Sequence, residues 1–174
     1  MTDFRHRMVV LLPRLRAFAH ALARTPDGAD DLLQATCEKA LRAADSWTPG
    51  TRLDSWMFRI MQNQWIDTKR RSRPQVAIDE PETGLQLAGD DGERIMEARL
   101  TLASVREFIA TLPEEQRAVL VLVCVEDVSY REAAEILDVP MGTVMSRLAR
   151  ARSALIDSVN GTGRSPSRAP GVVS

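Results

Sequence analysis

Residues 129–155, SYREAAEILDVPMGTVMSRLARARSAL, decide the expected fold of the second half of the chain. Their apolar spacing predicts two helices, at about 129–137 and 141–158, joined by the turn Asp138-Val139-Pro140. Ser129 and Glu132 have the spacing of a capping box, in which each side chain binds the other's backbone N–H at a helix start. The small side chains of Ala133 and Ala134 allow two helices to cross closely. The stretch therefore predicts a helix-turn-helix.

The second of these helices is expected to have two unlike faces. Val144, Leu148 and Ala151 fall on one narrow apolar stripe, which suits a shared core. The opposite side carries hydrogen-bond donors, namely Thr143, Ser146, Arg147 and Arg150. Residues 141–156 hold three arginines and no acid. One face would pack while the other enters a DNA groove. An amphipathic helix with a solvated arginine face is the alternative.

The rest of the chain also has helical periodicity, with no run that alternates as a strand does. We expect further helices at about 4–24, 28–44, 54–71, 94–111 and 114–125. Residues 74–93 contain prolines, glycines and six acids without a base, which predicts a linker. The expected organisation is all-α, with two small helical domains at 1–73 and 94–160 and a disordered tail at 161–174.

Composition excludes several other classes of protein. The net charge is −1, no apolar run reaches the roughly 20 residues of a membrane span, and no signal-peptide pattern is present, so a cytoplasmic protein is expected. His6 and His20 lack neighbours at metal-ligand spacing, and no nucleophile–base pair or P-loop is apparent, so we expect no cofactor and no catalysis. Cys37 and Cys124 fall on apolar stripes and are expected to be buried; a redox-active thiol is the alternative.

Residues 53–73, LDSWMFRIMQNQWIDTKRRSR, combine aromatic and basic residues on one expected helix. Trp56 and Trp65 are nine residues apart and therefore point to opposite sides. Trp65 shares the apolar arc and is expected in the core. Trp56 lies at its edge near Arg59 and Asn63, where it either closes the core or stacks on an unpaired base. Basic side chains at the end of the helix would hold phosphates: Arg70, Arg71 and Arg73.

These motifs together resemble one protein family. The helix-turn-helix, preceded by LPEEQRAVLVL (112–122), resembles region 4 of the extracytoplasmic-function class of bacterial RNA polymerase sigma factors. DGADDLLQATCEKALRA (27–43) is similar to the region 2 helix that docks on the polymerase clamp. TPGTRLDSWMFRIMQNQWIDTKRRSR (48–73) resembles the part of region 2 that reads and melts the −10 element. The departures are small: Asp138 stands where glycine is usual, and Met145 where lysine is frequent.

The resemblance implies a sigma factor that binds core RNA polymerase, through the clamp helices of its largest subunit and its flap region, and directs it to promoters. It implies DNA and an anti-sigma factor as further partners, and no membrane insertion. For the −10 element the implied residues are Arg52, Ser55, Trp56, Arg59, Asn63, Arg70, Arg71 and Arg73. For the −35 element they are Arg131, Thr143, Ser146, Arg147, Arg150 and Arg152. For the clamp they are Asp30, Asp31, Leu32, Gln34 and Glu38, with Leu32 expected to point outward.

Three alternatives stay open at this point. A stand-alone helix-turn-helix regulator would leave the acidic helix at 28–44 unexplained. A sigma-like decoy that titrates an anti-sigma factor would not need the arginines of the last helix. The linker acids Asp79, Glu80, Glu82, Asp90 and Asp91 are either a solvated spacer or a mimic of nucleic acid in the polymerase channel that the family's linker threads.

Overall fold

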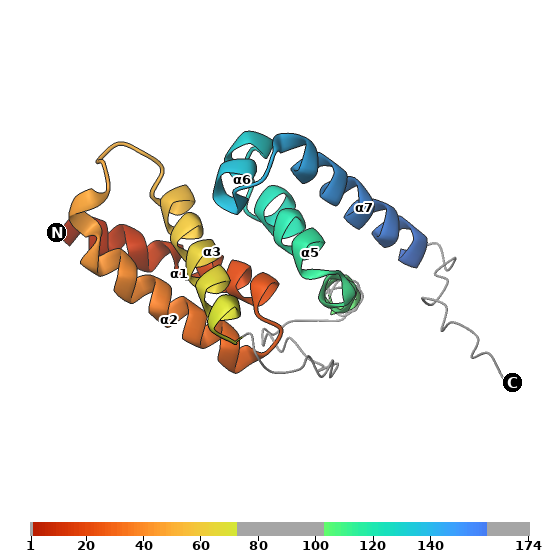
Figure 1. The fold of residues 1–174 in the computed structure, drawn as a ribbon, viewed down its shortest axis with the longest axis horizontal. Coiled ribbons are helices and arrows are strands. Elements are labelled where there is room, and N and C mark those ends of the chain that lie inside the picture. Colours follow the sequence, from red (N-terminus) through yellow and green to blue (C-terminus); the bar gives the residue numbers. More distant parts are fainter. Residues whose placement is uncertain (1, 73–102, 160–174) are drawn as a thin grey trace, which may run out of the picture.

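The computed structural model describes residues 2–72 and 103–159 (Figure 1). Within these two ranges every regular element is a helix and none is a strand, which confirms the all-α prediction. The elements are α1 (Thr2–Leu22), α2 (Pro26–Arg42), the 3-10 turn η1 (Ala44–Ser46), α3 (Leu53–Ser72), a helical stretch at 103–111, α5 (Glu114–Leu120), the π-helix η2 (Val121–Val125), α6 (Tyr130–Leu137) and α7 (Met141–Val159). The predicted linker at 74–93 and the tail at 161–174 lie outside the described residues, so the domain boundaries stay a prediction.

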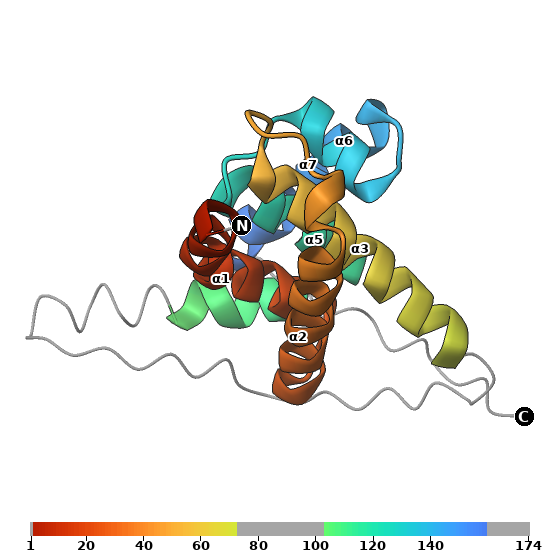
Figure 2. The ribbon, with the colours of Figure 1, turned by 90° about the vertical axis from the view of Figure 1, so that its left-hand side faces the viewer.

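Helices α1, α2 and α3 pack against one another and form what we call the first bundle (Figure 2). Its centre holds Leu15, Phe18, Met57, Phe58 and Met61, none of which is measurably exposed. The rings of Phe18 and Phe58 meet edge to face, with their centroids 5.3 Å apart. Burial of these large side chains is the main stabilising contribution to the bundle, and it fixes which way α3 faces.

Helix α2 begins two residues before the predicted start because Thr25 caps it. The Thr25 hydroxyl accepts a hydrogen bond of 3.1 Å from the backbone N–H of Gly28, and Pro26 occupies the first helical turn. Both features favour a helix start at this place. An added Cβ at Gly28 would lie 2.8 Å from the Thr25 hydroxyl oxygen, so the capping hydroxyl would have to shift.

Helices α5, α6 and α7, with η2 and residues 103–111, form the second bundle. The predicted capping box is confirmed: Ser129 and Glu132 exchange both hydrogen bonds at the start of α6. Asp138 ends α6 with φ 53° and ψ 50°, the left-handed conformation that the turn needs and that Asp tolerates. Val144, Leu148 and Ala151 are buried beside Ala133, which confirms the predicted apolar stripe of the helix-turn-helix.

The two bundles contact each other directly, with α3 beside α6 and α1 beside α5 (Figures 1 and 2). Arg117 of α5 is almost fully buried at this boundary and donates hydrogen bonds to the carbonyl oxygens of Ala21 and Leu112. Ala21 lies in the last turn of α1, where carbonyls have no partner within the helix. Burial lowers the pKa of the Arg117 guanidinium. The boundary therefore contains a polar group that ties both bundles together.

Three burial predictions are wrong. Leu32 is buried, at 5% exposure, because α2 packs against both α1 and α3 and so hides a wider arc than one stripe. Leu41 shares a helical stripe with Leu33, Cys37 and Ala40, which predicts burial from the sequence, but it is 42% exposed near the end of α2. Cys124 is exposed rather than buried; it lies in the π-helix η2, whose hydrogen bonding departs from the α-helical period on which the prediction rested. Among the described residues, no helix is long and apolar enough to cross a membrane.

Candidate nucleic-acid interface

The predicted −10 residues at the start of α3 are held by acidic side chains. Arg52 donates hydrogen bonds of 2.8 Å to Asp54 and of 2.8 Å to Glu132 of α6. The Ser55 hydroxyl lies 3.3 Å from the same Glu132 carboxylate. Arg59 donates to the carbonyl oxygen of Glu135 at 3.3 Å, and its guanidinium lies 3.8 Å from the Glu135 carboxylate. This end of α3 thus faces the helix-turn-helix.

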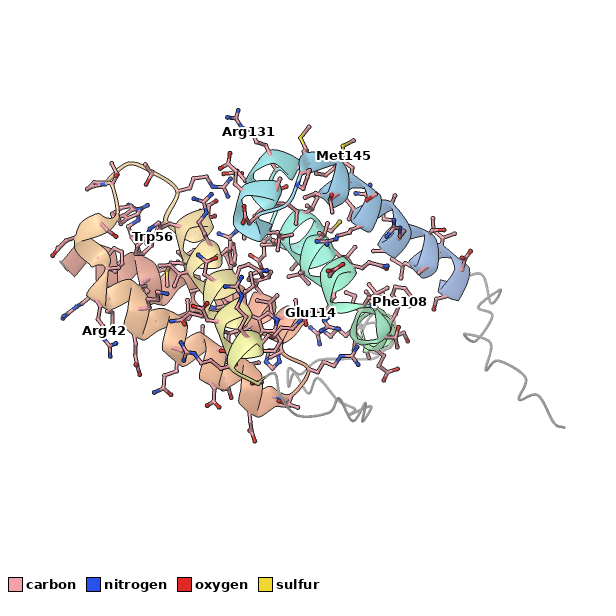
Figure 3. All side chains as sticks on the ribbon, in the orientation of Figure 1. Arg42, Trp56, Phe108, Glu114, Arg131 and Met145 are labelled. Atoms are coloured by element: carbon pink, nitrogen blue, oxygen red, sulfur yellow. The ribbon has the colours of Figure 1, made fainter. Side chains whose placement is uncertain are left out.

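Trp56, labelled in Figure 3, belongs to an aromatic cluster with Phe4 and Trp47. It is half-buried, and its ring meets Phe4 edge to face at 6.1 Å. Phe4 also contacts the buried Trp47, at 5.8 Å, and the Arg7 guanidinium lies 4.9 Å from the Trp47 ring. The contact with Phe4 supports the structural role of Trp56, while its exposed part leaves room for base stacking.

The remaining basic and polar side chains of α3 lie farther along the helix. Asn63, Arg70 and Arg71 are exposed, and Arg73 lies outside the described residues. Trp65, predicted to be in the core, is half-buried and packs against it. Its indole N–H donates a 2.9 Å hydrogen bond to Glu114 of α5, which also binds Lys69 at 3.1 Å.

The predicted −35 residues divide into an exposed group and a partly covered group. Arg131, Ser146, Arg150 and Arg152 are exposed on α6 and α7. Figure 3 shows Arg131 and Met145 pointing outward at the end where α6 meets α7. Arg147 instead has only 18% of its side chain exposed and lies 3.0 Å from Glu115 of α5. Thr143 is also half-buried, and the Arg152 guanidinium lies 3.9 Å from the Cys124 sulfur.

Arg147 also lines a cleft between the bundles with a volume of about 520 Å³. Residues from α3, α5 and α7 surround the cleft, among them Gln62, Ile66, Lys69 and Glu115. The face of α7 that carries Arg147 therefore points toward α3 and α5, whereas the face with Ser146 and Arg150 points to solvent. Arg147 and Arg150, which the sequence places on the same face of this helix, therefore point in different directions in the structure.

The predicted clamp surface on α2 is polar and faces away from the second bundle (Figure 1). Asp30, Asp31, Gln34 and Glu38 are all exposed, but Leu32 is buried and cannot contribute an apolar contact. These side chains make only weak hydrogen bonds and ion pairs with neighbours on the same surface. Gln34 donates to Glu38 at 3.1 Å, Arg42 approaches Glu38 at 3.7 Å, and Arg16 approaches Asp30 at 3.7 Å. This surface is free to bind a partner.

A charge network links α1, α3 and the second bundle beneath the −10 residues. Arg14 of α1 donates to the Glu126 carboxylate at 2.6 Å and to Asp54 at 3.0 Å. Burial of Asp54 favours its neutral form, but hydrogen bonds from Arg52, the Ser55 backbone and Arg14 outweigh it and lower the pKa of Asp54 from 3.8 to about 2. The hydrogen bond to Asp54 is also the main reason that the pKa of Arg52 is raised. Asp54 is therefore charged at neutral pH.

Sequence reasoning missed Arg14, Asp54, Glu126 and Glu132 as members of this network. Glu132 was recognised only as part of the capping box. Arg14 and Glu126 carry no local signal, since the partners of Arg14 lie 40 and 112 residues away. Asp54 is bound by Arg52 two residues away, but its bond to Arg14 joins distant parts of the chain. Among residues 2–72 and 103–159, no cluster of three His, Cys, Asp or Glu side chains is arranged to hold a metal ion. Cys37 is half-buried, and burial raises the pKa of its thiol, which disfavours the reactive thiolate.

Comparison with known proteins agrees with this geometry. Residues 9–75 match the Sigma-70 region 2 family, and residues 102–155 match Sigma-70, region 4. The chain is 36% identical over 156 residues to the ECF RNA polymerase sigma factor EcfG of Rhodopseudomonas palustris, covering 89% of this chain and 84% of that one. It is 31% identical over 137 residues to the ECF sigma factor SigW of Bacillus subtilis, covering 73% of each.

Solved structures give the same result. The sigma factor RpoE of Bartonella quintana, in complex with the anti-sigma factor NepR, is similar with a TM-score of 0.71 and 29% identity, over 94% of this chain and all of that one. CnrH, in complex with the cytosolic domain of CnrY, has a TM-score of 0.62 and 26% identity, over 92% and 89% of the two chains. This chain belongs to the extracytoplasmic-function class of bacterial RNA polymerase sigma factors.

Proposed function

We propose a division of labour among three surfaces of this sigma factor. Promoter-specific transcription initiation is the function of its family and of this chain. Within that function, the exposed side of α6 and α7 would bind the −35 element, the start of α3 would bind the −10 element, and the acidic side of α2 would bind the clamp helices of core RNA polymerase. The chain would act as an initiation factor and leave catalysis to the polymerase.

The observation that carries this proposal is the exposed polar side of the helix-turn-helix. Arg131, Ser146, Arg150 and Arg152 are all accessible there, and the turn is held by the capping box and by the left-handed Asp138. Arginine is the side chain best suited both to base edges in the major groove and to phosphates. A helix presented in this way on a rigid support can enter the groove without rearrangement of its own bundle.

The −10 assignment rests on residue type and placement. Arg52, Ser55, Trp56 and Arg59 lie within two turns at the start of α3, and Arg70 and Arg71 lie exposed toward its end. Hydrogen-bonding side chains beside an aromatic ring suit an unstacked base, and the distal arginines suit the phosphates that follow it. The linker acids lie outside the described residues, so their role as a nucleic-acid mimic stays a separate prediction.

An anti-sigma factor is the partner we propose for regulation. The relative RpoE is bound to the anti-sigma factor NepR in its solved structure. This chain shares the fold of that relative over 94% of its length. Pull-down with a candidate anti-sigma factor, followed by loss of core polymerase binding, would test this partner.

Reconstituted transcription tests the proposed function as a whole. Purified core RNA polymerase with this chain should produce run-off transcripts of defined length from a subset of a promoter library. The Arg150→Ala variant should lower transcript yield, whereas Glu107→Gln, at an exposed position on 103–111 outside the proposed surfaces, should not. Equal yields from both variants would remove α7 from promoter recognition.

A further inference from the structure

Helix α7 exposes apolar side chains on the side that is proposed to bind the −35 element. Met145 has 49% of its surface exposed, and Met141, one turn earlier, has 51%. Residues four apart share one side of a helix, so the same side continues to the exposed Ala149. Single exposed apolar residues are common on protein surfaces. The place of Met145 in the helix-turn-helix, rather than its exposure, therefore indicates what it contacts.

Three features put Met145 within reach of a DNA groove. It lies in the second turn of α7, which begins at Met141, and residues near the start of a recognition helix are those that contact base edges. Its neighbours Ser146 and Arg150 are exposed and belong to the proposed −35 surface. Figure 3 shows the side chain of Met145 pointing outward, as does that of Arg131. Met145 thus projects where bases would lie.

Other side chains of this part of α7 are already engaged. Arg147 is two residues further on, and it is held by Glu115 at 3.0 Å with only 18% of its side chain exposed. The Ser146 hydroxyl donates a 3.1 Å hydrogen bond to the carbonyl oxygen of Thr143 in the same helix. Met145 has no hydrogen bond to give up, because a thioether is at most a weak acceptor. It can enter a groove in the orientation that it has here.

The base that suits an apolar side chain in the major groove is thymine. Each base pair presents hydrogen-bond donors and acceptors there, and thymine adds a C5-methyl group. An apolar side chain against that methyl group removes both surfaces from water, which favours thymine over the other bases. Methionine carries no charge and no N–H or O–H donor, so it cannot bind a phosphate as arginine does. Its contribution is sequence preference rather than general affinity.

We propose that Met145 is a specificity-determining residue, whose side chain contacts the methyl group of a thymine in the −35 element. This inference rests on the proposed binding of that element by α7. Arg150 lies five residues after Met145, a rise of about 7.5 Å along the helix, which is close to two base-pair steps of about 3.4 Å. The thymine therefore lies within about three base pairs of the position that Arg150 contacts.

The test replaces thymine by deoxyuridine, which pairs with adenine in the same way but lacks the methyl group. A labelled duplex is taken from a promoter at which the chain directs transcription, and each thymine of its −35 block is replaced in turn, on both strands. Fluorescence anisotropy measures the affinity of the holoenzyme assembled from the full chain and core polymerase. Replacement of one thymine should weaken binding about fourfold, which corresponds to about 0.8 kcal/mol for one buried methyl group.

Two variants of similar size separate an apolar contact from a structural effect. Met145→Gln keeps the length and helix propensity of the side chain but makes it polar, and should abolish the fourfold difference between thymine and deoxyuridine. Met145→Leu stays apolar and should retain the difference. The matched control is Ile156→Ala, which removes another exposed apolar side chain of α7, about 16 Å further along the helix. It should retain the full difference.

Three results would each overturn the role of Met145. They are a −35 block in which no thymine is sensitive to loss of its methyl group, an unchanged sensitivity in Met145→Gln, and an equal loss of sensitivity in Met145→Gln and Met145→Leu. Failure of the proposed function has a different appearance, because Arg150→Ala would then leave holoenzyme affinity and transcript yield unchanged. If the role of Met145 alone is wrong, Arg150→Ala still weakens binding.

Discussion

Arg147 and Arg150 are both on α7, but the structure predicts unequal roles for them at the −35 element. Arg150 is exposed on the outward side, whereas Arg147 has 18% of its side chain exposed and is paired with Glu115 at 3.0 Å. From sequence alone Arg147 and Arg150 are equal candidates for a base contact, since both project from the polar side of the helix. The structure separates them, because Arg147 must leave Glu115 and turn before it can reach DNA.

The expected loss of DNA-binding affinity follows from two free-energy contributions, one from the base contact and one from the ion pair. A base-edge contact by arginine is worth about 1–3 kcal/mol, so Arg150→Ala should weaken duplex binding by roughly 5- to 150-fold and relax preference at one position. Breaking a partly exposed ion pair costs up to about 1 kcal/mol, which reduces the net benefit of any contact by Arg147. Arg147→Ala should therefore weaken binding about fivefold less than Arg150→Ala does.

The DNA affinity of both variants is measured by fluorescence anisotropy. The labelled duplex is taken from a promoter at which the chain directs transcription. The titrations are repeated over a series of salt concentrations, since a lost phosphate contact lowers the salt slope by about 1, whereas a lost base contact changes preference among duplexes. If Arg147→Ala weakens binding as much as Arg150→Ala or more, α7 turns in the complex and the orientation deduced from the ion pair with Glu115 is wrong.

Three further predictions concern stability and polymerase binding. Phe58→Ala should lower the free energy of unfolding by about 3–5 kcal/mol in a urea titration, since Phe58 is fully buried, while Ile156→Ala, at 58% exposure, should change it little. Folding lowers the pKa of Asp54 from the usual 3.8 to about 2. The charged Asp54 therefore stabilises the folded chain above pH 3.8, and this contribution is lost as the pH falls toward about 2. In thermal unfolding over this pH range, Asp54→Asn should make the stability less dependent on pH. Reversing charge at Asp31 and Glu38 to Lys should weaken association with core polymerase in a pull-down while leaving binding to −35 duplex intact; normal holoenzyme formation would exclude α2 as the clamp surface.

Local signals made the helix-turn-helix predictable. The capping box at Ser129 and Glu132, the left-handed tolerance of Asp138 and the spacing of Val144 and Leu148 all act within a few residues, and each appears in the structure as expected. The order and type of the helices were predictable for the same reason, because apolar periodicity needs no knowledge of the partner element.

Features that depend on distant partners were not predictable. Leu32 is buried because both α1 and α3 cover α2, which no pattern within α2 reveals. The pairs of Arg52 with Glu132 and of Arg14 with Glu126 join residues 80 and 112 positions apart, so type and spacing along the chain carry no trace of them. Arg147 and Arg150 illustrate the same limit, since one turn of helix separates a side chain facing α5 from one facing solvent.

Run-off transcription on a randomised promoter library tests most directly whether this chain directs initiation through two DNA elements. Purified core RNA polymerase with the chain should enrich templates that share one conserved block at the −35 position and another at the −10 position, with a fixed spacing. Core polymerase alone should enrich neither block. Enrichment of a single block, or of the same templates with and without the chain, would contradict the account.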